Sequence, residues 1–176
     1  PGERHAIEEN WIKAYPCCLQ THGAIEAALA AREAGAGGEP EASIEVRVHP
    51  VSLQAAPVND PGDGLQAKFS IPYLAAFALL HGAPGLDSFD GVDSAASKLG
   101  ERVEVTADPG LAESEARLAI DGEQLARVEA ALGSPQRPLG REALAAKRRG
   151  LAGERLEGAL DDLDRPAAEI LETLEI

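Results

Sequence analysis

The chain has 176 residues, of which 44% are hydrophobic and 26% are charged. This composition is ordinary for a globular protein and argues against disorder. Its 16 Lys and Arg residues against 30 Asp and Glu residues give a net charge of −14. Such an acidic surface repels nucleic-acid phosphates and anionic lipids, and aromatic residues that could stack on bases are few. We therefore expect neither nucleic acid nor a membrane as a partner.

The ends and the cysteines indicate the setting of the protein. The sequence begins at Pro1, contains no Met and shows no secretory signal, so we expect a piece of a longer protein. Its longest apolar stretch, residues 71–80, is about half of what a membrane span requires. The only cysteines are the neighbours Cys17 and Cys18, which provide no disulfide framework. A reducing, cytoplasmic setting fits. We expect both cysteines to be small packing residues. Because the four histidines are scattered, we expect no metal site.

The first third of the chain predicts a helix followed by a strand. A helix capped by Thr21 is expected to run to about residue 34, where the Gly-rich run 35–40 ends it. Residues 43–49 then alternate apolar and polar side chains, which is typical of a half-buried strand. The inward positions of that strand are Ile44, Val46 and Val48.

The middle of the chain predicts a buried helix and a hairpin. Residues 66–81 read as a helix that is apolar nearly all round, with Pro72 in its first turn or just after a break. A short helix over residues 92–99 and strands over 102–106 and 115–120 follow. Asp121-Gly122 is a two-residue hairpin turn into a last strand, 124–128. Residues 43–130 thus predict an antiparallel or mixed sheet with helices on one face, an α+β fold.

The chain is predicted to be helical again from Arg141, with breaks at residues 150–153 and at Pro166. The tail, residues 166–176, is short. A final helix of this length needs a surface to pack on.

Three segments, in order, resemble the C-terminal portion of the MmgE/PrpD family. The first is Ile12-Lys13-Ala14-Tyr15-Pro16-Cys17-Cys18 with His22 and Ile25-Glu26-Ala27-Ala28 after it. The second is Gln66-Ala67-Lys68-Phe69-Ser70-Ile71-Pro72-Tyr73. The third is Gly133-Ser134-Pro135-Gln136-Arg137-Pro138-Leu139 with Leu144-Ala145-Ala146-Lys147 after it. We call them the first, second and third motif.

The resemblance implies an architecture. Members of that family, which include 2-methylcitrate dehydratase, cis-aconitate decarboxylase and iminodisuccinate epimerase, have a large helical domain and a smaller α+β lid domain. Residues 1–140 would be the lid, and residues 141–176 would be helices that return to a helical domain absent from this sequence. The active site would lie between the two domains, use no metal or other cofactor, and take small anionic di- or tricarboxylates.

The same resemblance indicates candidate catalytic residues. Lys13 stands where the family has a substrate-contacting lysine and could neutralise a carboxylate, although a solvated surface lysine is the alternative. Tyr73 matches a position facing the interdomain cleft, with a core-edge aromatic as the alternative. His22 is a candidate proton carrier by residue type, although isolated histidines are usually structural. Lys68 could face either the cleft or solvent. Cys18 stands about where family decarboxylases carry a histidine, which argues against decarboxylation.

Two functions from different classes follow. The first is the lid of a lyase, in particular a 2-methylcitrate dehydratase-like hydro-lyase, whose partners would be a carboxylate substrate and a helical domain in the same or a separate chain, with a homodimer as one assembly. The second is a non-catalytic interaction or oligomerisation module, in which the tail beyond Arg141 docks.

Overall fold

The computed structural model describes residues 9–36, 42–160, 166 and 168–169, with side chains left out over 152–160. The chain divides into two compact units, residues 1–138 and residues 139–176. Over the described residues it contains six α-helices and one four-stranded sheet. All of the sheet lies in the first unit, so the predicted α+β class is confirmed.

The sheet is mixed, because it contains both parallel and antiparallel strand pairs. Its strands are β1 (Ile44–Val48), β2 (Val103–Ala107), β3 (Ala116–Ile120) and β4 (Glu123–Val128), in the spatial order β2-β1-β3-β4. β1 pairs parallel with β2 and antiparallel with β3, and β3 pairs antiparallel with β4. The predicted hairpin turn is confirmed, because Asp121 and Gly122 both have positive φ, 52° and 81°, as a tight two-residue hairpin turn requires.

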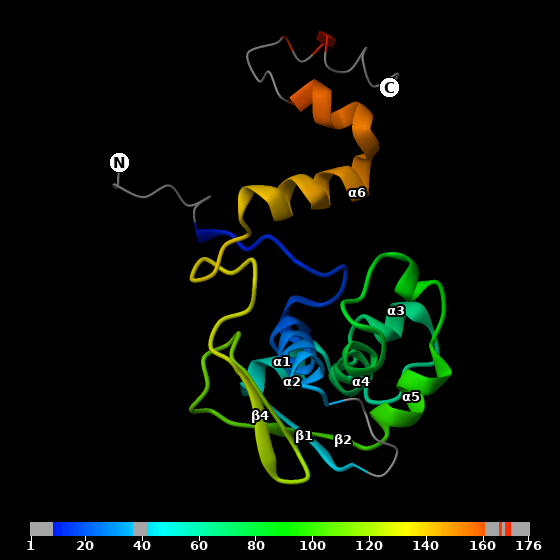
Figure 1. The fold of residues 1–176 in the computed structure, drawn as a ribbon, viewed down its shortest axis with the longest axis vertical. Coiled ribbons are helices and arrows are strands. Elements are labelled where there is room, and N and C mark those ends of the chain that lie inside the picture. Colours follow the sequence, from blue (N-terminus) through cyan, green and yellow to red (C-terminus); the bar gives the residue numbers. More distant parts are fainter. Residues whose placement is uncertain (1–8, 37–41, 161–165, 167, 170–176) are drawn as a thin grey trace. The chain divides into compact units, whose positions relative to one another are not determined.

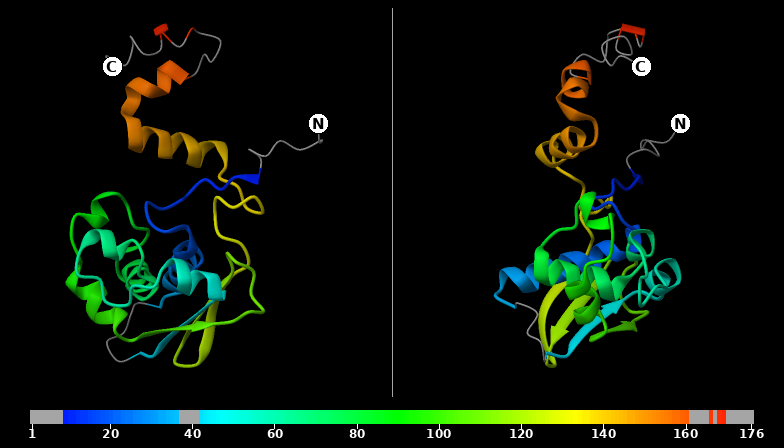
Figure 2. Two further views of the ribbon diagram at one scale, coloured as in Figure 1. Left: turned by 180° about the vertical axis from the view of Figure 1, so that it is seen from behind. Right: turned by 90° about the vertical axis from the view of Figure 1, so that its right-hand side faces the viewer.

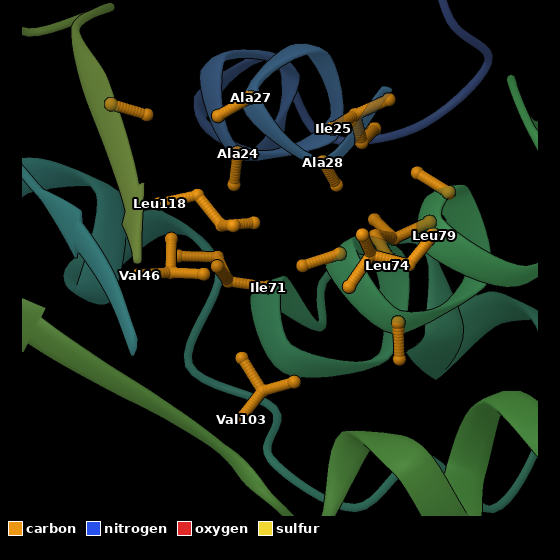
Figure 3. Close-up of a cluster of buried hydrophobic side chains, with 14 of the residues drawn as sticks. Ala24, Ile25, Ala27, Ala28, Val46, Ile71, Leu74, Leu79, Val103 and Leu118 are labelled. Atoms are coloured by element: carbon orange, nitrogen blue, oxygen red, sulfur yellow. The ribbon is translucent and has the colours of Figure 1, made fainter. Parts of the chain in front are cut away.

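Two helices, α1 (His22–Glu33) and α4 (Ile71–His81), cover one face of this sheet (Figures 1 and 2). The predicted inward positions of β1 are buried, each with at most 1% of its surface exposed. They meet side chains from both helices, and alanines on α1 allow close approach (Figure 3). The buried set that Figure 3 labels is Ala24, Ile25, Ala27, Ala28, Val46, Ile71, Leu74, Leu79, Val103 and Leu118.

The single helix predicted over residues 66–81 is wrong in one respect, because the chain forms two helices there. α3 (Gly64–Ala67) ends before Ser70, whose hydroxyl accepts a hydrogen bond from the Tyr73 N–H and caps α4. Pro72 lies in the first turn of α4, where its missing N–H costs nothing. The break therefore precedes Pro72, which is one of the two placements expected from the sequence.

Two further short helices, α2 and α5, each begin at a side-chain cap. α2 (Pro50–Ala55) was not expected, and His49 caps it by accepting the Val51 N–H at Nδ1. α5 (Ser94–Gly100) starts after Asp93, whose carboxylate accepts the Ala96 N–H. The described residues also form 3₁₀ turns at Leu19–Thr21 and at Asp87–Phe89.

The sheet face turned away from the helices is polar. Arg47, Arg117 and Arg127 lie in register across β1, β3 and β4. The buried carboxylate of Glu115 pairs with Arg117 at 3.2 Å and with Arg127 at 3.0 Å. Burial opposes its ionisation, but the Ala112 N–H and the two guanidinium groups outweigh burial and hold the pKa of Glu115 below its usual range.

The second unit consists, in its described part, mainly of α6 (Arg141–Leu160). The break predicted at residues 150–153 is wrong, because α6 runs through them. Figure 1 shows instead that the helix bends sharply partway along, which the glycines of this stretch permit. The short helix predicted for the tail falls mostly outside the described residues.

Candidate functional site

Parts of the three motifs, distant in sequence, meet in the first unit. The first motif begins in an irregular segment, residues 11–18, that we call the arc, and continues onto α1. At one end the Ile12 N–H donates to the Gly133 carbonyl of the third motif, with N···O 2.9 Å. At the other end the Cys18 N–H donates to the Lys68 carbonyl of the second motif, also at 2.9 Å. Backbone hydrogen bonds therefore hold the arc at both of its ends.

The anchor at Gly133 depends on the absence of a side chain. Gly133 has φ +90°, and a Cβ placed there would lie 1.9 Å from the Ile12 carbonyl oxygen. A tight turn follows, in which the Gly133 N–H donates to the Arg137 carbonyl at 2.8 Å and the Arg137 N–H donates to the Ser134 carbonyl at 3.0 Å. We call residues 131–137 the clamp loop. Only glycine lets this loop approach the arc so closely.

An ion pair between the buried Glu26 and the exposed Arg137 joins the clamp loop to α1. Glu26 is 7% exposed, and its Oε2 pairs with Nη1 of Arg137, while its Oε1 accepts the Leu132 N–H. The same Arg137 nitrogen also donates to the Ala130 carbonyl at 3.3 Å. Both oxygens of the buried carboxylate are thus satisfied by groups in or beside the clamp loop, as a buried charge requires.

Tyr15, in the arc, lies beside this pair. Burial raises the pKa of its phenol well above the usual range, the Glu26 carboxylate adds to the effect, and the Arg137 guanidinium opposes it. The ring also meets His22 edge-on, with centroids 5.1 Å apart. Tyr15 therefore stays protonated at neutral pH and fills the space between the arc and α1.

The two lysines of interest, Lys13 and Lys68, both act on the Cys17 thiol of the arc. Burial raises the pKa of the Cys17 thiol to about 11, and the Thr21 hydroxyl and the Lys13 and Lys68 ammonium groups act in the opposite direction. Both ammonium groups are therefore within electrostatic reach of that sulfur. Lys13 is exposed, and Lys68 Nζ lies 5.2 Å from the centroid of the Phe89 ring.

The structure places Tyr73 elsewhere. Its side chain is 1% exposed, and its hydroxyl accepts the Asp93 N–H at 3.0 Å, at the start of α5. The Asp93 carboxylate also meets His81 Nε2 at 3.1 Å, which ties the end of α4 to the same cap. Burial raises the pKa of the Tyr73 phenol. Within the described residues, no hydrogen bond joins Tyr73 to the arc.

His22 is buried and contacts the arc through Tyr15. It is the first residue of α1, and its side chain has no exposed surface. Through the contact between its ring and that of Tyr15, His22 forms part of the surface on which the arc packs. The structure thus brings Lys13 and His22 to one region and leaves Tyr73 at the α4–α5 junction.

Cys17 is buried and Cys18 is partly buried, in agreement with a packing role. Cys17 is 4% exposed, and its sulfur lies 3.2 Å from the Thr21 hydroxyl. Thr21 precedes α1 as predicted, but its hydroxyl donates to the Cys18 carbonyl at 2.7 Å and does not cap the helix. The Cys18 sulfur lies 3.7 Å from the Ala55 carbonyl oxygen.

Sequence reasoning missed Glu26 and Arg137, which are 111 positions apart. Only one signal could have found the pair. Glu26 interrupts the apolar face of an Ala-rich helix, and a charge there needs a partner. An open groove of about 720 Å³ lies beside the pair, and its wall includes Arg127 and Glu129 as well. Two cations and two anions balance there, so this groove does not select an anion.

The described part of the chain lacks two features, a metal-binding cluster and a membrane-spanning helix. It holds no cluster of three His, Cys, Asp or Glu side chains that could bind a metal ion. None of its helices combines the length and the apolar character needed to cross a bilayer.

A comparison with known families gives one match. The model of the MmgE/PrpD C-terminal domain matches residues 15–173, which include Tyr15, His22, Tyr73 and Arg137, and Lys13 lies just before the matched range. No curated protein matches the chain.

Proposed function

Since this chain belongs to the MmgE/PrpD family, we propose that it is the lid part of a lyase that acts on small di- or tricarboxylates. The family contains dehydratases, and the proposed reaction is that of a 2-methylcitrate dehydratase-like hydro-lyase. One observation supports this most: all three motifs converge on the arc that carries the exposed Lys13. A helical domain, in the same or a separate chain, would complete the site.

The proposed chemistry divides between the two domains. A base removes the proton from the carbon next to a carboxylate, the electron pair of that C–H bond forms the C=C bond, and hydroxide leaves from the neighbouring carbon as an acid protonates it to water. The helical domain would supply most of this proton transfer. Lys13 would hold a substrate carboxylate by charge and so orient the C–H bond toward the base.

The other two candidates take different parts in this proposal. His22 is buried behind Tyr15, so a role in proton transfer would have to act through groups of the arc. Tyr73 would have to release the Asp93 N–H and move past the start of α5 to reach a substrate. We therefore assign substrate contact first to Lys13.

The experiment uses the complete gene product and measures metal-independent dehydration of 2-methylcitrate. Lys13→Ala should lower kcat/KM roughly 10- to 100-fold, because a charged hydrogen bond to a carboxylate contributes about 1.5–3 kcal/mol. Lys98→Ala, at an exposed lysine on α5, is the control and should leave kcat/KM unchanged. Equal activity of both variants would contradict the substrate role of Lys13.

The second candidate is a non-catalytic interaction module. It is favoured by the burial of Tyr73 and His22, two of the three candidate catalytic side chains. Absence of turnover by the complete protein on di- and tricarboxylates would favour this candidate. A homodimer and a cytoplasmic location belong to the first proposal, and light scattering and cell fractionation test them.

A further inference from the structure

The backbone around Lys13 lies outside regular secondary structure. Residues 13–17 belong to no helix or strand, so no ladder of hydrogen bonds fixes them. Ile12, immediately before Lys13, is fixed by the bond from its N–H to Gly133. The other anchor, at Cys18, lies five residues further along. The backbone position of Lys13 is therefore expected to respond directly to the clamp loop.

The clamp loop in turn depends on a charge. Within the loop, backbone hydrogen bonds make a tight turn, but these bonds do not attach it to the rest of the unit. Glu26 attaches the loop to α1 through Arg137 on one oxygen and the Leu132 N–H on the other, in addition to the burial of Ala131 and Ser134. α1 is itself held by the core through Ala24, Ile25 and Ala28. A continuous path therefore runs from the core through Glu26 and Arg137 to Ile12.

We propose that Arg137 is a positioning residue that, paired with Glu26, holds the clamp loop and thereby places Lys13 against a substrate carboxylate. The inference rests on the proposed function, because it assumes that Lys13 contacts substrate. Arg137 itself stays with Glu26 and does not touch the substrate. Its contribution to catalysis passes through the arc.

A double-mutant cycle tests the path in the complete protein. Arg137→Met, which keeps the length of the side chain but removes its charge, should lower kcat/KM roughly 10-fold, because small displacements of an orienting group are costly. In the Lys13→Ala background the same substitution should cause no further loss, because the positioned group is already gone. Arg137→Lys should recover part of the activity by restoring a charge beside Glu26.

The control is Arg127→Met, which removes another arginine beside the same groove. Arg127 pairs with Glu115 and Glu129 and has no bond to the clamp loop, so this variant should keep the wild-type kcat/KM. If Arg137→Met does not fold, as thermal unfolding and circular dichroism would show, Glu26→Gln replaces it. That variant keeps the shape of the carboxylate and weakens the same pair.

A second readout needs no activity. Hydrogen exchange of the Ile12 amide should become faster in Arg137→Met, whereas the Cys18 amide, bonded to Lys68, should keep its wild-type rate. A purely structural role of Arg137 would instead accelerate both amides together with the core.

The outcomes separate the two proposals. Absence of turnover by the complete wild-type protein overturns the proposed function, whereas full activity of Lys13→Ala overturns the substrate role of Lys13 and with it the positioning role of Arg137. A clear loss in Lys13→Ala, combined with an independent and additive loss in Arg137→Met and an unchanged Ile12 amide, overturns the positioning role and leaves the proposed function standing. Non-additive losses with selective exchange at Ile12 support both.

Discussion

The arc that carries Lys13 and the helix α4 that carries Tyr73 belong to the same unit but are held by different forces. α4 is surrounded by apolar side chains, and Ile71, Leu74 and Leu79 have no exposed surface. The arc has two backbone anchors, and the half-exposed ion pair between Glu26 and Arg137 lies behind it. Packing spreads the stability of α4 over many contacts, whereas the arc depends on a few that can be removed singly. Tyr73 is therefore placed by the whole core and Lys13 by a small number of bonds.

The largest effect should come from the core. Leu74→Ala removes a fully buried side chain between α1 and α4 and should lower the free energy of unfolding by about 2–5 kcal/mol. Urea denaturation measures this loss. Leu65→Ala is the matched control, because Leu65 is 68% exposed, and it should change stability by less than about 0.5 kcal/mol. A similar loss in both variants would mean that α4 is not the centre of the core.

A somewhat smaller and local effect should come from the anchor. Gly133→Ala adds a Cβ against the Ile12 carbonyl and forces a non-glycine residue to φ +90°, which together should cost about 2–4 kcal/mol. Gly82→Ala separates the two causes, because Gly82 has φ +92° with open space around it. Gly82→Ala should lower the free energy of unfolding by less than Gly133→Ala does, and the difference is the contribution of the steric clash. Only Gly133→Ala should accelerate exchange of the Ile12 amide, and equal behaviour of the two variants would refute the close approach.

Most of the fold could be predicted because its signals are local. The alternation of β1, the Asp121-Gly122 turn and the apolar run of α4 each act over a few residues, and each is observed. The errors occurred where local signals compete. Ser70 starts a new helix within the predicted 66–81 helix, and the glycines near residue 150 bend α6 without ending it.

The candidate site could be predicted only in part because it is built from distant residues. The motif that carries Lys13 was visible in the sequence, but nothing local shows that Glu26 would find Arg137 across 111 positions or that Gly133 would meet Ile12. The burial of Tyr73 follows from the packing of α4 on α5, which a single helix pattern does not contain. The catalytic roles of Lys13, His22 and Tyr73 stay predictions.

The smallest effect should appear at Cys17, where the arc joins the core. Its thiol is shifted from the ordinary pKa of 9.0 to about 11, so the folded chain keeps this proton at a pH where the unfolded chain loses it. The resulting stabilisation is complete below pH 9 and is lost as the pH rises through 11, and about 1 kcal/mol of it should disappear between pH 8 and 10. Tyr15 adds a similar trend only above its ordinary pKa of 10.0.

Urea denaturation at pH 8 and pH 10 should show this slope in the wild-type chain and in Cys18→Ala, and a shallower slope in Cys17→Ala. Alkylation gives the matching kinetic test. At pH 8 iodoacetamide should modify Cys18 well before Cys17, because Cys17 is both buried and held as the thiol. Faster modification of Cys17 would show that this end of the arc opens readily, and the packed part of the unit would then begin only after Cys17.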